Sequence, residues 1–112
     1  MCLIVVVNKV HPSFPLIIAA NRDEFLDRPT RQAEFWDDAP HVLAGKDLRH
    51  GGTWMGITTT NRLAALTNYR EPTRLSVEGS SRGVLVRNAL EADFDPKEPE
   101  RYDGHNLIYG QL

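Results

Sequence analysis

Cys2 is the residue whose position most directly suggests chemistry. Methionine aminopeptidases remove an initiator methionine when the second residue is small, and cysteine qualifies. The mature chain would then begin with a residue that carries both a thiol and a free α-amino group. Because an α-amine titrates at about 7.7–8.0 and a free thiol at about 8.5, the amine can accept the thiol proton near neutral pH. Position 2 therefore predicts a nucleophile with its own base; the plainer alternative is a small apolar residue that starts a strand.

A polar run, Asn21-Arg22-Asp23-Glu24, follows the second apolar segment of the chain. If the first two apolar segments form a hairpin, this run returns to the chain start, beside Cys2. Asp23 could then hold or orient the amine, and Arg22 could activate the thiol or grip a substrate carboxylate. The alternative is a polar turn with surface ion pairs, which stabilise a protein little. The two features together favour the functional interpretation.

Short strands are the elements expected to position these residues. Residues 2–10 are dense in β-branched side chains and predict a strand buried on both faces. A loop with two prolines at 11–15 separates it from a second strand at 16–20, so the two should pair as an antiparallel hairpin. Residues 25–40 mix aromatics, charges and prolines without a period, and predict an ordered loop.

The remaining chain predicts four more strands, at 42–45, 53–58, 63–68 and 105–110. A turn is expected at 60–62 and a loop at 69–79. A helix is predicted at about 82–92, capped by Ser80 or Ser81 and ended by residues 95–99. Its inward face would be made of Leu85, Ala89 and Leu90. Strands followed by one helix indicate the α+β class, and 112 residues suit a single domain.

The composition excludes several classes of protein. Hydrophobic residues make up 41% and charged residues 25% of the chain, which is typical of a globular protein. The net charge is −2 without a basic stripe, so nucleic acid is not an expected partner. The apolar run at 3–7 is far shorter than the roughly 20 residues of a membrane span, and it lacks the flanks of a secretory signal. A lone cysteine fits a reducing compartment, so we expect a cytoplasmic protein.

The four histidines, His11, His41, His50 and His105, are widely spaced and follow no metal-binding pattern. We expect them on the surface or in loops, and we expect neither a metal site nor a cofactor. The two tryptophans, Trp36 and Trp54, are expected in the core or in a pocket wall.

A series of short motifs resembles the NRDE-motif proteins, the family that includes the transport and Golgi organization proteins. The motifs are Met-Cys before an apolar strand, ANRDEF at 20–25, RP at 28–29, LAGKD at 43–47, GGTWMG at 51–56, LTNYR at 66–70, SRG at 81–83 and NLIYG at 106–110. They occur in the family's order over nearly the whole chain. Each motif is short, but the set is specific.

The resemblance implies an N-terminal-nucleophile (Ntn) hydrolase-like fold, an antiparallel sheet sandwich flanked by helices. The enzymatic relatives that it suggests are cysteine amidases such as choloylglycine hydrolases and penicillin V acylases, in which an N-terminal cysteine attacks an amide carbonyl. Carried over by position, Arg22 and Asp23 would support Cys2. Asn68, at a strand end, would donate a hydrogen bond to the oxyanion.

Two further residues, Asn21 and Trp54, are expected on the substrate side of this site. In the amidases, intervening residues separate the arginine from the aspartate. In this sequence Arg22 and Asp23 are adjacent, so they cannot point the same way from a strand. The family's proteins are also longer than this chain. We therefore expect residues 1–112 to be the N-terminal, incomplete portion of a single domain, with open sheet edges that invite homo-oligomers.

The sequence leaves different functions open. The first is hydrolysis of non-peptide linear amides by acyl transfer through Cys2. The second is a non-catalytic binding or carrier protein that keeps the Ntn-like fold, for which the resemblance implies haem handling or another small ligand. The third is an inactive fragment. For the protein as a whole we favour the hydrolase, with a small-molecule amide as its partner.

Overall fold

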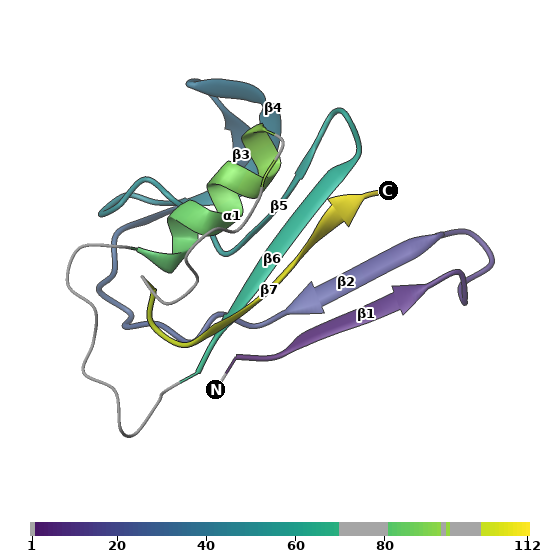
Figure 1. The fold of residues 1–112 in the computed structure, drawn as a ribbon, viewed down its shortest axis with the longest axis horizontal. Helices are drawn as coiled ribbons and strands as arrows, with labels where there is room; N and C mark the ends of the chain where they lie inside the picture. The colour runs from purple at the N-terminus through teal and green to yellow at the C-terminus, as the bar shows by residue number, and fades with distance from the viewer. Residues whose placement is uncertain (1, 70–80, 93, 95–101) are drawn as a thin grey trace.

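The computed structural model describes residues 2–69, 81–92, 94 and 102–112 (Figure 1). Its elements are β1 (Ile4–Asn8), β2 (Leu16–Ala20), β3 (Thr30–Trp36), β4 (Ala39–Asp47), β5 (Met55–Thr58), β6 (Arg62–Asn68), α1 (Arg82–Glu91) and β7 (His105–Gln111). Antiparallel strands with one helix are compatible with the expected α+β class. The fate of Met1, a cap by Ser80, most of the loop at 69–79 and the helix end at 95–99 lie outside the described residues.

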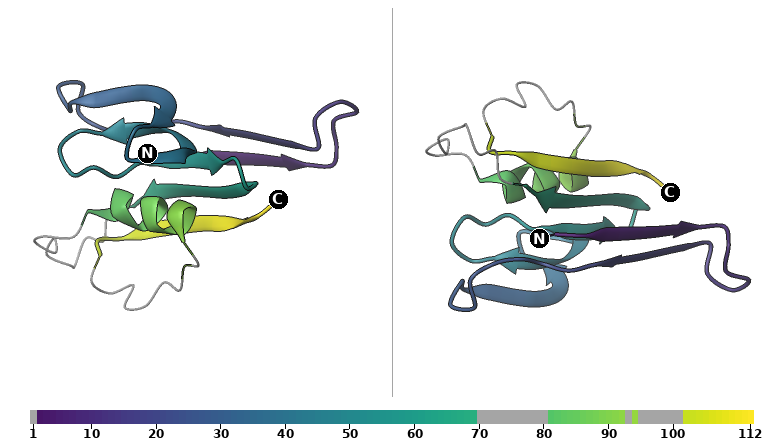
Figure 2. Two further views of the ribbon diagram at one scale, coloured as in Figure 1. Left: turned by 90° about the horizontal axis from the view of Figure 1, so that it is seen from above. Right: turned by 90° about the horizontal axis from the view of Figure 1, so that it is seen from below.

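Two antiparallel sheets form the frame of the molecule. β1 pairs with β2, with Ile4 opposite Ala20 and Asn8 opposite Leu16, as the predicted hairpin requires. The other sheet has the order β3-β4-β5-β6-β7, so each strand pairs with its neighbour in the sequence. The tip of the β1–β2 hairpin projects beyond the end of β7, as Figure 2 shows.

The core lies between α1 and one face of the five-stranded sheet. Its buried residues are Trp36, Ala39, Val42, Ala44, Ala64, Leu66, Leu85, Val86, Ala89 and Leu90. The predicted inward face of the helix is confirmed, and Val86 belongs to it as well. Trp36 is also a core residue, and its indole nitrogen donates a hydrogen bond to the carbonyl oxygen of Ala44 at 3.1 Å.

Close packing in this core depends on small residues of the sheet. A Cβ at Gly56 would lie 2.7 Å from Cδ1 of Leu90, so only glycine lets α1 approach β5 this closely. Ser81 occupies the N-cap position of α1 as predicted, but its side chain makes no capping hydrogen bond. The helix start is held instead by packing against the chain before β5.

The prediction of a loop at 25–40 is wrong. β3 occupies Thr30–Trp36, and β4 is much longer than the predicted strand at 42–45. β3 is an edge strand in which only Trp36 is buried, so its sequence has no apolar alternation to reveal it. Irregular register between β3 and β4 weakens the pattern further.

The prediction that the first strand is buried on both faces is also wrong. Val5 and Val6 are each 47% exposed, and among the described strands β1 pairs with β2 alone. The strand ends at Asn8 because Lys9 has a left-handed backbone conformation (φ 56°) and its amide donates a hydrogen bond to the carbonyl oxygen of Pro15. β-branched residues thus mark the strand correctly but do not indicate its burial.

The later strands agree with the sequence. β5, β6 and β7 overlap the strands predicted at 53–58, 63–68 and 105–110, with small shifts at their ends. Asn61 (φ 62°) makes the predicted turn between β5 and β6. In the described part of the chain, no helix has both the length and the apolar character that crossing a membrane would require.

Candidate functional site

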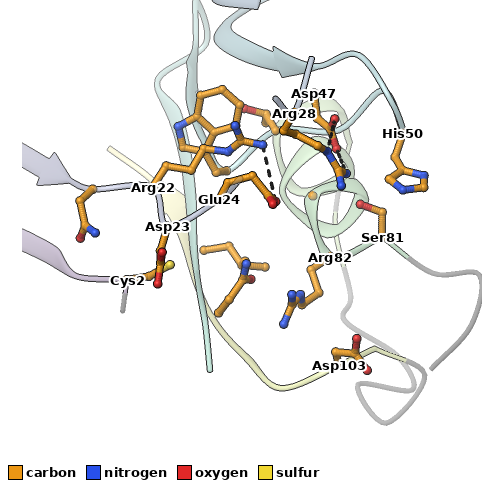
Figure 3. Close-up of a pocket in the computed structure, with 16 residues that line it drawn as sticks. Cys2, Arg22, Asp23, Glu24, Arg28, Asp47, His50, Ser81, Arg82 and Asp103 are labelled. Carbon is orange, nitrogen blue, oxygen red and sulfur yellow. Dashed lines mark hydrogen bonds and ion pairs between the residues drawn. The ribbon is translucent and has the colours of Figure 1, made fainter. Parts of the chain in front are cut away.

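Segments far apart in the sequence meet around a cavity of about 370 Å³ (Figure 3). Its walls come from the chain start, the segment after β2, the chain before β5, the end of β6 and the start of α1. The six site residues predicted from the sequence all line it: Cys2, Asn21, Arg22, Asp23, Trp54 and Asn68. The fold therefore brings the predicted residues together.

Cys2 and Asp23 both line this cavity, and the Asp23 side chain points toward Cys2 (Figure 3). The Cys2 side chain is a free, half-buried thiol. Both residues also line an adjoining hollow of about 630 Å³, together with Asn68 and Arg82. A ligand in the cavity can therefore reach the sulfur, a carboxylate and a carboxamide at once.

Asn21 holds the chain start against the end of β2. Its side-chain Oδ1 accepts a hydrogen bond from the amide of Leu3 at 2.7 Å, and its own amide donates to the carbonyl oxygen of Leu3 at 3.2 Å. These two bonds fix the residue next to Cys2. Asn21 thus has a positioning role in addition to the substrate contact expected from the sequence.

Arg22 points away from Cys2, whereas Asp23 points toward it (Figure 3). This divergence is what adjacent residues on an extended chain should show. The Arg22 guanidinium lies over the Trp54 ring at 4.2 Å from its centroid and 4.0 Å from Oε2 of Glu24. Trp54 is therefore a cavity wall that carries a cation, and Arg22 is not in contact with the thiol.

Asn68, the last residue of β6, has one side-chain atom in an unusual state. Its Oδ1 is buried and has no hydrogen-bond partner among the described residues. Buried polar atoms in native proteins are nearly always paired, and exceptions are common at functional sites. The carboxamide thus keeps unused hydrogen-bonding capacity beside Cys2.

The structure adds an ion pair that the sequence analysis did not single out. Arg28 donates from Nε to Oδ1 of Asp47 at 3.1 Å and from Nη2 to Oδ2 at 2.6 Å. The Arg28 side chain is 16% exposed and that of Asp47 is 8% exposed. Both residues lie within family motifs, RP at 28–29 and LAGKD at 43–47. These motifs are the sequence feature from which a role for the two residues could have been predicted.

This pair shifts the titration of both partners. Burial alone would raise the pKa of Asp47, but hydrogen bonds from Arg28 and from the Arg49 amide, with Coulombic interactions with Arg28 and His50, lower it overall. The hydrogen bond to Asp47 raises the pKa of Arg28 further above its usual value. Both groups therefore stay charged in the cavity wall at neutral pH.

Two glycines join the chain before β5 to the start of α1. A Cβ at Gly52 would lie 2.4 Å from the carbonyl carbon of Gly83, and the amide of Thr53 donates to the Gly83 carbonyl at 3.1 Å. This contact places Ser81 and Arg82 in the cavity wall. Arg82 in turn donates from Nη1 to the carbonyl oxygen of Gly104 at 3.0 Å. The sequence predicts no role in the site for Gly52, Gly83 or Arg82, although these residues belong to the motifs GGTWMG at 51–56 and SRG at 81–83.

Among residues 2–69, 81–92, 94 and 102–112, no three histidine, cysteine, aspartate or glutamate side chains are grouped so as to hold an ion. His50 is exposed as expected and lines the cavity. His41 and His105 differ from the expectation, because they are half-buried within β4 and β7.

The family model described as Transport and Golgi organisation 2 matches residues 1–112. The chain belongs to this family. It is 45% identical over 111 residues to the Transport and Golgi organization protein 2 homolog of Bos taurus, covering 89% of this chain and 40% of that protein. The Homo sapiens homolog is 42% identical over 111 residues, with the same two coverages. The Drosophila melanogaster Transport and Golgi organization protein 2 is 34% identical over 111 residues, covering 91% of this chain and 37% of that protein.

This member of the Transport and Golgi organisation 2 family thus spans about two-fifths of the length of the curated relatives that it matches. The family match extends over every residue that lines the cavity. The site is therefore built within the region that this chain shares with the family.

Proposed function

We propose that this family member is an N-terminal-cysteine amidohydrolase with an Ntn-hydrolase-like fold, which cleaves non-peptide linear amides by acyl transfer through Cys2. The observation that carries the proposal is the meeting of Cys2, Asp23 and Asn68 around one cavity. These residues come from the chain start, from the segment after β2 and from the end of β6. A thiol, a carboxylate and a carboxamide in one cavity are the groups that acyl transfer needs.

The proposed reaction has two steps. After removal of Met1, the α-amine of Cys2 takes the thiol proton and the sulfur attacks the amide carbonyl carbon. The C–N bond then breaks, and the leaving amine takes a proton from the α-ammonium group. In the second step water attacks the thioester, the C–S bond breaks, and the carboxylic acid and the free thiol are released. Atoms and protons balance without a cofactor.

The neighbouring residues have distinct roles in this proposal. Asp23 stabilises the α-ammonium form and orients the amine, because it lies on the same side of the cavity as Cys2. Asn68 donates from Nδ2 to the oxyanion. Asn21 positions the chain start through its two hydrogen bonds with Leu3.

The activity is proposed for the whole protein. This chain corresponds to about two-fifths of the relatives' length. The resemblance implies that a second oxyanion asparagine and a further arginine lie outside it. The expected cytoplasmic location stays a prediction. If Cys2 is unreactive, the alternative function is favoured, which is a non-catalytic carrier of haem or of another small ligand.

The decisive test is an intact mass before and after brief treatment with limiting iodoacetamide. We expect the loss of one methionine and alkylation of Cys2 faster than that of N-acetylcysteine at about pH 6–7. D23N should slow the labelling, whereas D27N, at an exposed position outside the cavity, should not. Retention of Met1, or labelling no faster than that of the reference thiol, would contradict the proposal.

A further inference from the structure

We infer that the cavity takes a small ligand that carries a carboxylate, and that Arg22 binds this group while Trp54 and Gly45 hold Arg22 in place. The inference rests on the proposed function in one respect, because the ligand is taken to occupy the cavity that contains Cys2. It goes further by naming the charged group that the ligand must carry. It also assigns Trp54 as a positioning residue.

Arg22 is a cation whose N–H donors find no hydrogen-bond acceptor in the described part of the chain. Its side chain is only 25% exposed, yet it makes no hydrogen bond with any described residue. A guanidinium has five N–H donors. Oε2 of Glu24, with which Arg22 forms an ion pair, is 4.0 Å away, which is beyond hydrogen-bond distance. Oε1 of the same carboxylate already accepts from the amide of Phe25 at 2.9 Å.

The other arginines of the cavity are already engaged. Arg28 is bound through two hydrogen bonds to Asp47. Arg82 is oriented by its hydrogen bond to the Gly104 carbonyl. Arg22 is thus the cavity arginine whose donors are withdrawn from most of the solvent without an acceptor in the described chain.

The Trp54 ring gives Arg22 a fixed place. The guanidinium carbon is 4.2 Å from the ring centroid, within the range of a cation–π contact. The ring itself rests against Gly45, where a Cβ would lie 2.6 Å from Cη2 and 2.7 Å from Cζ2. Any larger residue at position 45 would therefore displace the ring and, with it, the guanidinium. The contact holds the guanidinium at the cavity wall, where its N–H donors can meet a ligand.

The geometry favours a carboxylate over other anions. A planar guanidinium matches the two oxygens of a carboxylate in a bidentate pair. Asp23 and Glu24 line the same cavity, and their negative charges oppose a ligand that carries more than one negative charge. A monoanionic amide therefore suits the cavity better than a phosphate ester.

The test compares two probes, N-acetylglycine and its neutral analogue N-acetylglycinamide, by calorimetric titration of the C2A variant of the chain. We expect the acid to bind about tenfold more tightly, since a charge-assisted hydrogen bond of about 1.4 kcal/mol corresponds to that ratio. R22Q should abolish the preference and R22K should reduce it. R31Q should not change it, because Arg31 is 49% exposed and pairs with Glu34 outside the cavity.

Variants of Trp54 and of Gly45 test whether Trp54 positions Arg22. W54F should keep the preference, whereas W54L and G45A should lose most of it while far-UV circular dichroism stays unchanged. Equal affinities for the two probes, no saturable binding of the acid, or full competition by inorganic phosphate would overturn the inference. Because C2A carries no thiol, these results are independent of catalysis: a preference for the acid together with an unreactive Cys2 would remove only the proposed hydrolase activity.

Discussion

Arg28 and Asp47 form a bidentate pair in which both side chains are largely withdrawn from solvent, with N–O distances of 3.1 and 2.6 Å. Removing one partner leaves the other charge uncompensated, which typically costs about 3–5 kcal/mol. R28M should therefore lower the free energy of unfolding by about 3 kcal/mol, measured by urea denaturation. The double variant R28M/D47N should be less unstable than the sum of the single variants, and additive effects would contradict a direct coupling.

The same pair predicts how stability depends on pH. Because the pKa of Asp47 is lower in the folded state than in the unfolded state, its stabilising contribution is present above about pH 4 and is lost as the pH falls through the folded value. Urea unfolding between about pH 6 and 3 should show this loss for the natural chain and a shallower dependence for D47N. If the free energy of unfolding of D47N depends on pH as steeply as that of the natural chain, Asp47 is not the group that causes the loss of stability.

Asp38 is a suitable control for this measurement. Hydrogen bonds from Lys46 and Arg87 lower the pKa of Asp38 to about 2. Its side chain is 48% exposed, so solvent and salt screen the two ion pairs. D38N should therefore change the pH slope less than D47N, and added salt should reduce its effect further.

Gly52 and Gly110 make a matched pair for testing the contact between the chain before β5 and α1. A Cβ at Gly52 would meet backbone atoms of Gly83 and Val84, whereas a Cβ at Gly110 would have nothing within 4 Å. G52A should destabilise the fold by about 2 kcal/mol through overpacking. G110A should stay within about 0.5 kcal/mol of the natural chain. Equal melting temperatures for the two variants would show that the contact is not rigid.

Much of the fold follows from local sequence, and the errors have physical causes. The strands with clear patterns and flanking turns, such as β6 with Asn61 before it, were predictable. β3 was missed because an exposed edge strand does not need alternating apolar residues. The burial of β1 was misjudged because it depends on which strands flank it, and a continuous β-branched run does not determine that.

The site residues were predictable as a set because a hairpin must bring the segment after β2 back to the chain start. The direction of Arg22 was not predictable. It is set by Trp54 and Gly45, which are both distant from Arg22 in the sequence. The pairing of β4 with β5 brings Gly45 and Trp54 together. The Arg28–Asp47 pair was missed for the same reason, since no local spacing links its partners.

Asn21 offers a direct test of how the chain start is held. N21A removes the acceptor for the Leu3 amide, whereas N21D keeps an oxygen in the same place. We expect iodoacetamide labelling of Cys2 in N21A to approach the rate of N-acetylcysteine, and labelling in N21D to stay closer to that of the natural chain. Hydrogen exchange of the Leu3 amide supplies the control, because it should accelerate only in N21A. Identical labelling in both variants would show that Asn21 does not position Cys2.

Association through sheet edges is the last prediction. β7 is the last strand of the five-stranded sheet, and its Ile108 and Tyr109 are each 44% exposed. Its outer backbone edge pairs with no strand in the described part of the chain and carries apolar side chains. We expect this chain to dimerise or form larger assemblies in a concentration-dependent way, measured by light scattering with size-exclusion chromatography. I108K should shift the population toward monomer, because a charge on an edge strand opposes edge-to-edge pairing. N88K, at an exposed position of α1 rather than at the edge, adds the same single positive charge and is the control. A monomer with a folded spectrum at high concentration would show that the exposed edge does not drive association.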